Sequence, residues 1–371
     1  MAGIVIDMFL NLKESSVAGI NARVDENVVF PIHRNANSAR VLFGGCWNNS
    51  GRQIVRNSIV KASQNSSNRS DALKATRQRR PQNVEGDFFV DHTCIDCDTC
   101  RWMAPTIFSQ VDEQAAVVKQ PSCKEERVKA LQALLSCPTS SIHTENAPLD
   151  ILQVQKTFPI PINEQRFPGV YHCGYHSEKS YGGASYIIVH PEGNILIDSP
   201  RFTERLAHNI DMLGGARYMF LTHKDDVADH EKWSKRLKCT RILHEKDVEV
   251  STADVEIKLG GSGPWSLGND FELIHTPGHT EGCVSLLYKP LKILCAGDHL
   301  TIWGSELSIV EKFNRCSVPM QLNSVRKLLD EDFEWILPGH GRRVEFKDIK
   351  EKNSALEAFL ASREQPQIQS S

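Results

Sequence analysis

The chain has 371 residues, of which 40% are hydrophobic and 24% are charged, and its formal net charge is −3. This composition is typical of a globular protein, and the length allows two or three domains. No apolar run approaches the roughly 18 residues that a membrane span needs, and a near-neutral charge disfavours nucleic-acid binding. We therefore expect neither a membrane nor a nucleic acid as a partner, and the oligomeric state stays open.

The N-terminal part of the chain is rich in basic residues and poor in acids. Between positions 31 and 80, ten residues are Lys or Arg, and Asp71 is the only acid. A Ser- and Arg-rich, acid-poor N-terminus indicates an organellar transit peptide, and Ile59–Ser63 resembles a stromal processing site with cleavage after Ala62. We expect a transit peptide over residues 1–62, a disordered linker over residues 63–83 and a chloroplast location (stroma), ahead of the mitochondrion. A disordered tail that is never cut is the alternative.

Four of the chain's eleven cysteines are spaced in a way that suits an iron–sulfur cluster. Cys94, Cys97 and Cys100 are separated by two residues each, so their thiolates can hold one face of a cluster from a tight loop. Cys137, followed by proline, can supply the fourth ligand from the end of a helix. That helix is predicted from Lys124 onward, because apolar residues share one of its faces, namely Val128, Leu131, Leu134 and Leu135.

This cysteine pattern resembles a single-cluster ferredoxin of the bacterial type, and we place the ferredoxin-like domain at residues 84–145. The resemblance implies one 4Fe–4S cluster, bound by Cys94, Cys97, Cys100 and Cys137. A zinc knuckle is the alternative reading, but it would need two pairs of closely spaced cysteines, and Cys137 stands alone. Cys123 lies near the motif and outside its spacing.

A second region begins after a proline-rich linker, which we place at residues 146–165. Short apolar or alternating segments predict strands at residues 184–189, 194–198, 217–221 and 241–243, and amphipathic patterns between them predict helices at residues 205–213 and 230–237. Strands followed by helices indicate a mixed α/β domain with functional sites at the strand ends. We place this domain at residues 166–350 and a C-terminal helix and tail at residues 351–371.

Residues that commonly bind metals stand where the predicted strands stop. His223 ends one strand, His279 follows Pro-Gly, Asp298 follows a glycine, and His340 follows a second Pro-Gly. Glycine and proline allow the chain to turn sharply and to present a side chain at the edge of a sheet. Histidine and aspartate together suit Zn(II) or non-haem iron.

Taken together, these segments resemble the metallo-β-lactamase superfamily. In that superfamily T-H-x-H-x-D-H, P-G-H-T, a G-D segment and P-G-H-G follow one another in this order, and the aspartate of the segment N-I-L-I-D, Asp198, also agrees. The resemblance implies an α+β fold, a four-layer αββα sandwich with its metal site in a cleft at one edge, here preceded by a small ferredoxin-like α+β domain.

The chain departs from the superfamily motif at one place. Asp225 stands where the second histidine belongs, and Asp229 and His230 come two residues late, but a short insertion costs little closure entropy. The expected ligands of one or two Zn or Fe ions are therefore His223, Asp225, Asp229, His230, His279, Asp298 and His340. Asp225 or Asp226 either binds a metal or orients a histidine that does, unless both are merely solvated in a loop. The catalytic candidates are Asp229, which would orient the attacking water, and Asp226.

Other histidines are expected to have supporting roles. His275 and His299 stand beside the motifs, and His172 and His176 are candidates to line the pocket only as a second choice.

We predict the first of three functions for this chain, and the other two remain as alternatives. The first is a hydrolase for an ester, thioester or similar small-molecule substrate, in which a metal-bound water attacks and the cluster is structural or senses redox state. The second is an iron-dependent oxidoreductase fed with electrons by the cluster, since Asp225 resembles the flavodiiron branch, with a redox partner. The third is an electron-transfer protein without catalytic activity. Asp298 in place of the cysteine of many true β-lactamases disfavours antibiotic hydrolysis.

Overall fold

The computed structural model describes residues 77–304 and 306–364, all of which belong to one compact unit. The expected transit peptide, its processing site and residues 63–76 of the expected linker lie outside the described residues. Within them, no helix has both the length and the apolar character of a membrane span.

The first part of the described chain is a small α+β domain built around two antiparallel strand pairs. β1 (Phe88–Val90) pairs with β4 (Ile142–Thr144), and β2 (Phe108–Val111) pairs with β3 (Gln114–Val117). The short helix α2 (Thr99–Met103) packs on α3 (Lys124–Ser136), which is the helix predicted from its apolar face. Leu131 on that face is completely buried, so α3 forms the centre of this small core.

The prediction of a disordered linker over residues 63–83 is wrong for residues 77–83. The guanidinium of Arg80, only 2% exposed, donates to the carbonyls of Ala115 and Val111. The side chain of Asn83 donates to the carbonyl of Val90 and accepts from its amide. These side chains form hydrogen bonds with backbone groups of β1, β2 and β3 that a neighbouring strand would otherwise pair with. Residues 77–83 are therefore part of the first domain.

The second part is built on two sheets that face each other. One is seven-stranded, in the order β11-β10-β9-β8-β7-β6-β5, and the other six-stranded, in the order β12-β13-β14-β15-β18-β19. The strands of the first are β5 (Ile160–Pro161), β6 (Val170–His172), β7 (Tyr186–Ile188), β8 (Ile195–Ile197), β9 (Tyr218–Phe220), β10 (Thr240–His244) and β11 (Ile257–Leu259). Those of the second are β12 (Trp265–Leu267), β13 (Phe271–His275), β14 (Val284–Tyr288), β15 (Ile293–Gly297), β18 (Trp335–Pro338) and β19 (Val344–Glu345).

The segment expected to be a linker, residues 146–165, also has secondary structure. It contains the helix α4 (Ile151–Gln155) and strand β5, which is hydrogen-bonded to β6. The side chain of Val154 is buried. The first sheet therefore begins before residue 166, earlier than predicted.

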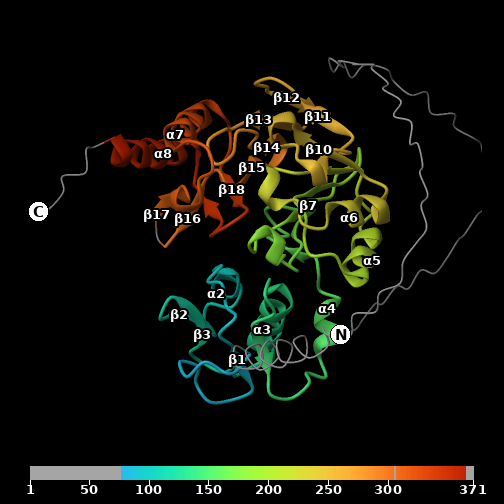
Figure 1. Ribbon diagram of the computed structural model, residues 1–371, viewed down its shortest axis with the longest axis vertical. Coiled ribbons are helices and arrows are strands. Elements are labelled where there is room, and N and C mark those ends of the chain that lie inside the picture. The colour runs from blue at the N-terminus through green and yellow to red at the C-terminus, as the bar shows by residue number, and fades with distance from the viewer. Residues whose placement is uncertain (1–76, 305, 365–371) are drawn as a thin grey trace, which may run out of the picture. The chain divides into compact units, whose positions relative to one another are not determined.

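Alternation along the strands divides the apolar side chains among three layers. The side chain of Ile187 on β7 lies in the same buried layer as helices α5 (Glu204–Met212) and α6 (His230–Leu237). Its neighbour Ile188 points the other way, toward the second sheet. On the second sheet Leu294 faces α7 (Val318–Lys327) and α8 (Ile349–Glu364). Figure 1 shows α5 and α6 on one side of the sheets and α7 and α8 on the other, which is the predicted αββα sandwich.

Candidate metal centre and cluster site

His223 is held at the end of the first sheet by a buried hydrogen-bond chain. The parallel neighbours β8 and β9 place Asp198 and Thr222 at the same edge of the sheet. The Thr222 hydroxyl donates to Asp198 Oδ2 over 3.1 Å and lies 3.0 Å from His223 Nδ1, whose N–H it accepts. The imidazole proton of His223 therefore lies on Nδ1, and the lone pair of Nε2 points away from these hydrogen bonds.

Four further residues gather around that nitrogen, and His340 adjoins them through Asp298. His223, Asp225 and His279 form one group of potential metal ligands, and His223, Asp226 and Asp298 form a second. Asp298 Oδ2 lies 3.6 Å from the Nε2 atoms of both His223 and His279. The sixth residue, His340, has its Nδ1 atom 2.7 Å from Asp298 Oδ1.

Several polar atoms of this group are buried without any hydrogen-bond partner. They are His223 Nε2, both carboxylate oxygens of Asp226 and both ring nitrogens of His279. Burial raises the pKa of Asp226 well above its usual value, and the Asp298 carboxylate outweighs burial and raises the pKa of His340 to about 10. Buried unpaired atoms are costly, and a bound cation would relieve that cost. Three imidazoles and three carboxylates fit one or two Zn or Fe ions.

Two glycines make room for the Asp226 carboxylate. A Cβ atom on Gly183 would lie 2.7 Å from both Asp226 oxygens, and one on Gly339 would lie 2.6 Å from Asp298 Oδ1 and 3.0 Å from Asp226 Oδ2. Any side chain at either position would displace a carboxylate. The segment from Pro338 to His340 thus has two roles: its glycine lets the carboxylates of Asp226 and Asp298 lie close to the backbone, and it supplies His340.

The structure does not bring Asp229 and His230 into this group, so the prediction for these two residues is corrected. Asp229 lies at the start of α6, where its carboxylate pairs with Lys179 and Lys232 and accepts the amide of Phe202. His230 is buried, and its Nδ1 lies 3.2 Å from the guanidinium of Arg241.

The physical reason is a short 3-10 turn, Lys224–Asp226, directly after His223. This turn directs Asp225 and Asp226 into the site and leaves the two later residues to begin a helix. Asp229 therefore cannot orient a metal-bound water as predicted. The adjacent pair of aspartates directly after Thr-His is the signal in the sequence for the residues that do reach the site.

The remaining histidines lie elsewhere. His275 Nε2 contacts the Glu281 carbonyl at 2.9 Å, and His299 is buried without a hydrogen-bond partner. His172 and His176 form a buried pair with their Nε2 atoms 2.8 Å apart. Neither lines the cavity described below.

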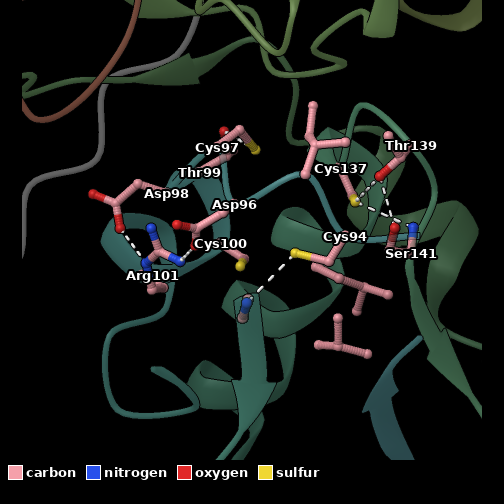
Figure 2. A pocket seen from close by; sticks show the side chains of 14 residues that line it. Cys94, Asp96, Cys97, Asp98, Thr99, Cys100, Arg101, Cys137, Thr139 and Ser141 are labelled. Carbon is pink, nitrogen blue, oxygen red and sulfur yellow. Dashed lines mark hydrogen bonds and ion pairs between the residues drawn. The ribbon is translucent and has the colours of Figure 1, made fainter. Parts of the chain in front are cut away.

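The four motif cysteines line one pocket of the first domain (Figure 2). Cys94 and Cys97 come from the loop that leads into α2, Cys100 lies in the first turn of α2, and Cys137 follows the last residue of α3. Burial raises the pKa of Cys97 to about 12 and that of Cys100 well above its usual value. Buried thiolates of this kind need a positively charged partner, which iron supplies. Cys123 is exposed and does not line the pocket.

Backbone and hydroxyl donors surround these sulfurs. Cys94 Sγ accepts the amide of Ala115 at 3.4 Å, and Cys137 Sγ accepts the amide of Ser141 at 3.3 Å. Such donors stabilise negative charge on a thiolate, so they suit a cluster ligand better than a neutral thiol.

A cavity of about 450 Å³ connects the two sites. Its lining includes Cys97 from the cluster loop and four residues of the metal group, Asp225, His279, Asp298 and His340. Its other lining residues are Ile95, Asp96, Glu178, Tyr181, Trp303, Val310, Phe313 and Arg315. A small molecule in this cavity would touch both sites.

Two parts of the chain match known protein families. Residues 90–144 match the 4Fe-4S single cluster domain of Ferredoxin I, and residues 181–340 match the metallo-beta-lactamase superfamily. The chain therefore joins a single-cluster ferredoxin domain to a metal-binding domain of the metallo-β-lactamase superfamily. Both resemblances drawn from the sequence motifs are confirmed.

Solved structures of similar fold include several β-lactamases. TMB-1 is 17% identical, with a TM-score of 0.43, and the match covers 52% of this chain and 94% of that chain. An archaeal metallo-beta-lactamase superfamily protein, ST1585 from Sulfolobus tokodaii, is 15% identical, with a TM-score of 0.40 and coverage of 54% and 88%. Comparison with curated proteins gives no match. None of these similarities bears on the reaction.

Proposed function

We propose that this protein is a metal-dependent oxidoreductase in which a 4Fe–4S cluster delivers electrons to a centre of one or two iron ions. The cluster would be held by Cys94, Cys97, Cys100 and Cys137. The second centre would be held by His223, Asp225, Asp226, His279, Asp298 and His340. A redox-active metal bound there would supply one-electron chemistry to a substrate in the adjoining cavity.

The shared cavity is the observation that carries this proposal. Its lining contains the cluster cysteine Cys97 together with Asp225, His279 and His340. A cluster with a purely structural role has no need to lie on the substrate cavity of another domain. Electron transfer, by contrast, benefits from a short distance between the two centres.

A second connection runs through the backbone. Gly182 approaches the cluster loop so closely that a Cβ atom there would lie 3.0 Å from Cys97 Cβ and 3.4 Å from its Sγ. The carbonyl of the preceding residue, Tyr181, lies 3.3 Å from His340 Nε2. One peptide segment thus contacts a cluster ligand and a residue of the metal group, which supports a packed route for electrons between them.

The donor set also favours iron. Asp225 replaces a histidine of the superfamily motif, so His223, Asp225 and His279 form a group of two histidines and one carboxylate. That combination with open positions is typical of non-haem Fe(II). The chain's own part is to hold these donors, to exclude bulk water with the cavity walls and to orient the substrate.

A hydrolase remains the second candidate, because of the place of Asp298. Its Oδ2 atom is equidistant, at 3.6 Å, from the Nε2 atoms of His223 and His279. A carboxylate so placed suits two metal ions that share a water molecule, which is the arrangement of many metallohydrolases. The substrate would then be an ester or thioester, and the cluster would be structural or redox-sensing.

Spectroscopy of protein purified without oxygen tests the proposal. Oxidised protein loaded with iron is given one electron equivalent of dithionite, and the spin of the reduced cluster is quantified by electron paramagnetic resonance. We expect fewer spins from the reduced cluster than electrons added, because some of the added electrons reside at the second centre. In His279→Ala, which removes a ligand of that centre, cluster spin should account for all electrons. Zinc at the centre, together with thioester turnover that ignores the cluster's redox state, would favour the hydrolase instead.

A further inference from the structure

We propose that the cavity binds an amphipathic monoanion, a carboxylate attached to an aromatic or alkyl body, and that Arg315 anchors the carboxylate. The inference rests on the proposed function only in taking this cavity as the substrate site. It names the chemistry that the cavity walls select, which neither family match specifies.

Arg315 is fixed at the edge of the metal group. Its backbone amide donates to the carbonyl of His279 at 2.9 Å, which ties this loop to the metal group. Its Nε lies 2.8 Å from Asp225 Oδ2, and its Nη2 lies 3.3 Å from the hydroxyl of Tyr181. The side chain is thus oriented before any ligand arrives, while 47% of it remains exposed.

The charge of Arg315 becomes available when a metal is bound. An Asp225 carboxylate that binds a cation shares its negative charge with that cation, so it neutralises the guanidinium less. The remaining N–H groups of Arg315 can then bind a carboxylate in the bidentate manner that guanidinium favours. Of the other acids in the lining, Asp298 is paired with His279 and His340, Asp96 is paired with Arg101, and Glu178 is exposed.

Four further lining residues are large and apolar, namely Ile95, Trp303, Val310 and Phe313. Trp303 and Phe313 line the cavity although 46% and 60% of their surfaces are exposed, and the cluster loop adds Ile95, which is 44% exposed. These three side chains come from β16 (Thr301–Trp303), from the turn Glu311–Phe313 and from the first domain. Large apolar side chains that remain exposed around one cavity mark a binding surface.

The cavity size is consistent with this ligand. About 450 Å³ lies within the range of roughly 300–1,000 Å³ that is usual for small-molecule sites. The body of the ligand would contact Trp303 and Phe313 while its carboxylate reaches Arg315, next to the metal group. Both a charge and an apolar body are therefore needed for tight binding.

The test measures binding of three probes to the anaerobic holoprotein by isothermal titration calorimetry: 4-phenylbutyrate, its uncharged amide, and butyrate. We expect the acid to bind roughly tenfold or more tightly than the amide, since a charge-assisted pair is lost in the amide. Butyrate should bind more weakly than 4-phenylbutyrate because it lacks the apolar body. In Trp303→Ala the acid and the amide should weaken together.

Variants of Arg315 separate the anchor from the metal. Arg315→Met should abolish the preference for the acid and leave the affinity for the amide unchanged. Arg236→Met, at a position on α6 outside the cavity lining, is the matched control and should behave as the wild type. Arg315→Lys keeps a positive charge beside Asp225 and should weaken acid binding several-fold, and metal content is measured in every variant.

Two results would overturn the inference: equal affinity for acid and amide in the wild type, or a preference for the acid that survives in Arg315→Met. A preference that survives in Arg315→Met and disappears when the metal is removed would show that the carboxylate binds the metal itself. Because binding is measured without turnover, failure of electron transfer between the two centres leaves this test unaffected, and the two proposals can fail separately.

Discussion

Thr99 is a buried hydroxyl between a cluster cysteine and the second domain. Its Oγ1 lies 3.4 Å from Cys97 Sγ and 3.1 Å from His176 Nδ1. The same nitrogen lies 2.7 Å from the carbonyl of Gly182, so the imidazole N–H is available to both acceptors. With the imidazole as donor, the Thr99 hydroxyl is free to donate to the sulfur, and hydrogen bonds to cluster sulfurs influence the reduction potential.

Replacing Thr99 should therefore change the potential of the cluster. We expect Thr99→Val to lower the midpoint potential, because the reduced cluster carries more negative charge and loses more from the missing donor. Thr99→Ser keeps the hydroxyl and should restore the wild-type value. A redox titration followed by electron paramagnetic resonance measures both, and an unchanged potential in the valine variant would contradict the assignment.

The paired histidines predict a loss of stability in acid. Burial lowers the pKa of His176 to about 3 and that of His172 well below its usual value. The unfolded chain binds protons at these residues below about pH 6.5 and the folded chain does not, so the free energy of unfolding falls as the pH drops below that value. At pH 5 the loss from His176 alone is about 2 kcal/mol.

Urea denaturation at pH 7.5 and at pH 5 measures this loss. His176→Asn removes the titrating group, so its stability should differ less between the two pH values than that of the wild type. An equal difference in both proteins would assign the acid sensitivity to other groups.

For individual residues, the sequence motifs identified some members of the metal group and assigned two others wrongly, for a physical reason. His223, His279, Asp298 and His340 each follow a strand, and a glycine precedes the last three, so their positions were predictable, and the structure brings them together. Whether Asp229 and His230 reach the metal group depends on how the loop after His223 closes. A single 3-10 turn directs Asp225 and Asp226 into the group instead, and the position of such a turn leaves no periodic pattern in the sequence.

At the scale of elements, the turn after β18 positions the second group of potential ligands. Gly339→Ala would place a methyl group 2.6 Å from Asp298 Oδ1, so we expect the variant to lose metal from the group formed by His223, Asp226 and Asp298. Elemental analysis should show less total metal per protein, while the visible absorbance of the iron–sulfur cluster stays unchanged. Gly260→Ala is the control, because its new Cβ would meet only the end of the Glu245 side chain, at 3.3 Å. Full metal content in Gly339→Ala would remove these residues from the ligand set.

Elements marked by a continuous apolar run or a helical period were predictable. The predicted helix over residues 230–237 coincides with α6, and the four predicted strands correspond to β7, β8, β9 and β10. Strands β11 and β12 were not predicted, although they have three residues each like β7, β8 and β9, because a polar residue, Lys258 or Ser266, interrupts the apolar run of each. The arrangement of layers followed from the family resemblance, because periodicity alone does not pair distant strands.

At the scale of the whole molecule, one hydrophobic cluster runs through both domains. It includes Leu131 and Val90 of the ferredoxin-like domain together with Leu196 and Ile210 of the second domain. The sequence did not predict this continuity, because the contacts join residues far apart in the chain. The same is true of the place of Cys97 in the wall of the cavity.

Phe158 lies in this shared cluster and offers a test of it. Its ring is 2% exposed and packs edge-on against Tyr175, with 5.0 Å between the ring centroids. We expect Phe158→Ala to lower the free energy of unfolding by about 3–5 kcal/mol. Because both domains share this hydrophobic cluster, far-ultraviolet circular dichroism and the absorbance of the iron–sulfur cluster should report a single unfolding transition in the wild type and in the variant. Two separate transitions in the wild type would show that the domains unfold independently.

The continuity of this cluster has a practical consequence for making the protein. Cys100 and Cys137 belong to it, so the iron–sulfur pocket is part of the common interior. A host cell that assembles too little iron and sulfide would leave buried, unpaired thiols in that interior and weaken the packing of the second domain as well. Yield of folded protein, and not only its colour, should therefore follow the supply of cluster-assembly factors during expression.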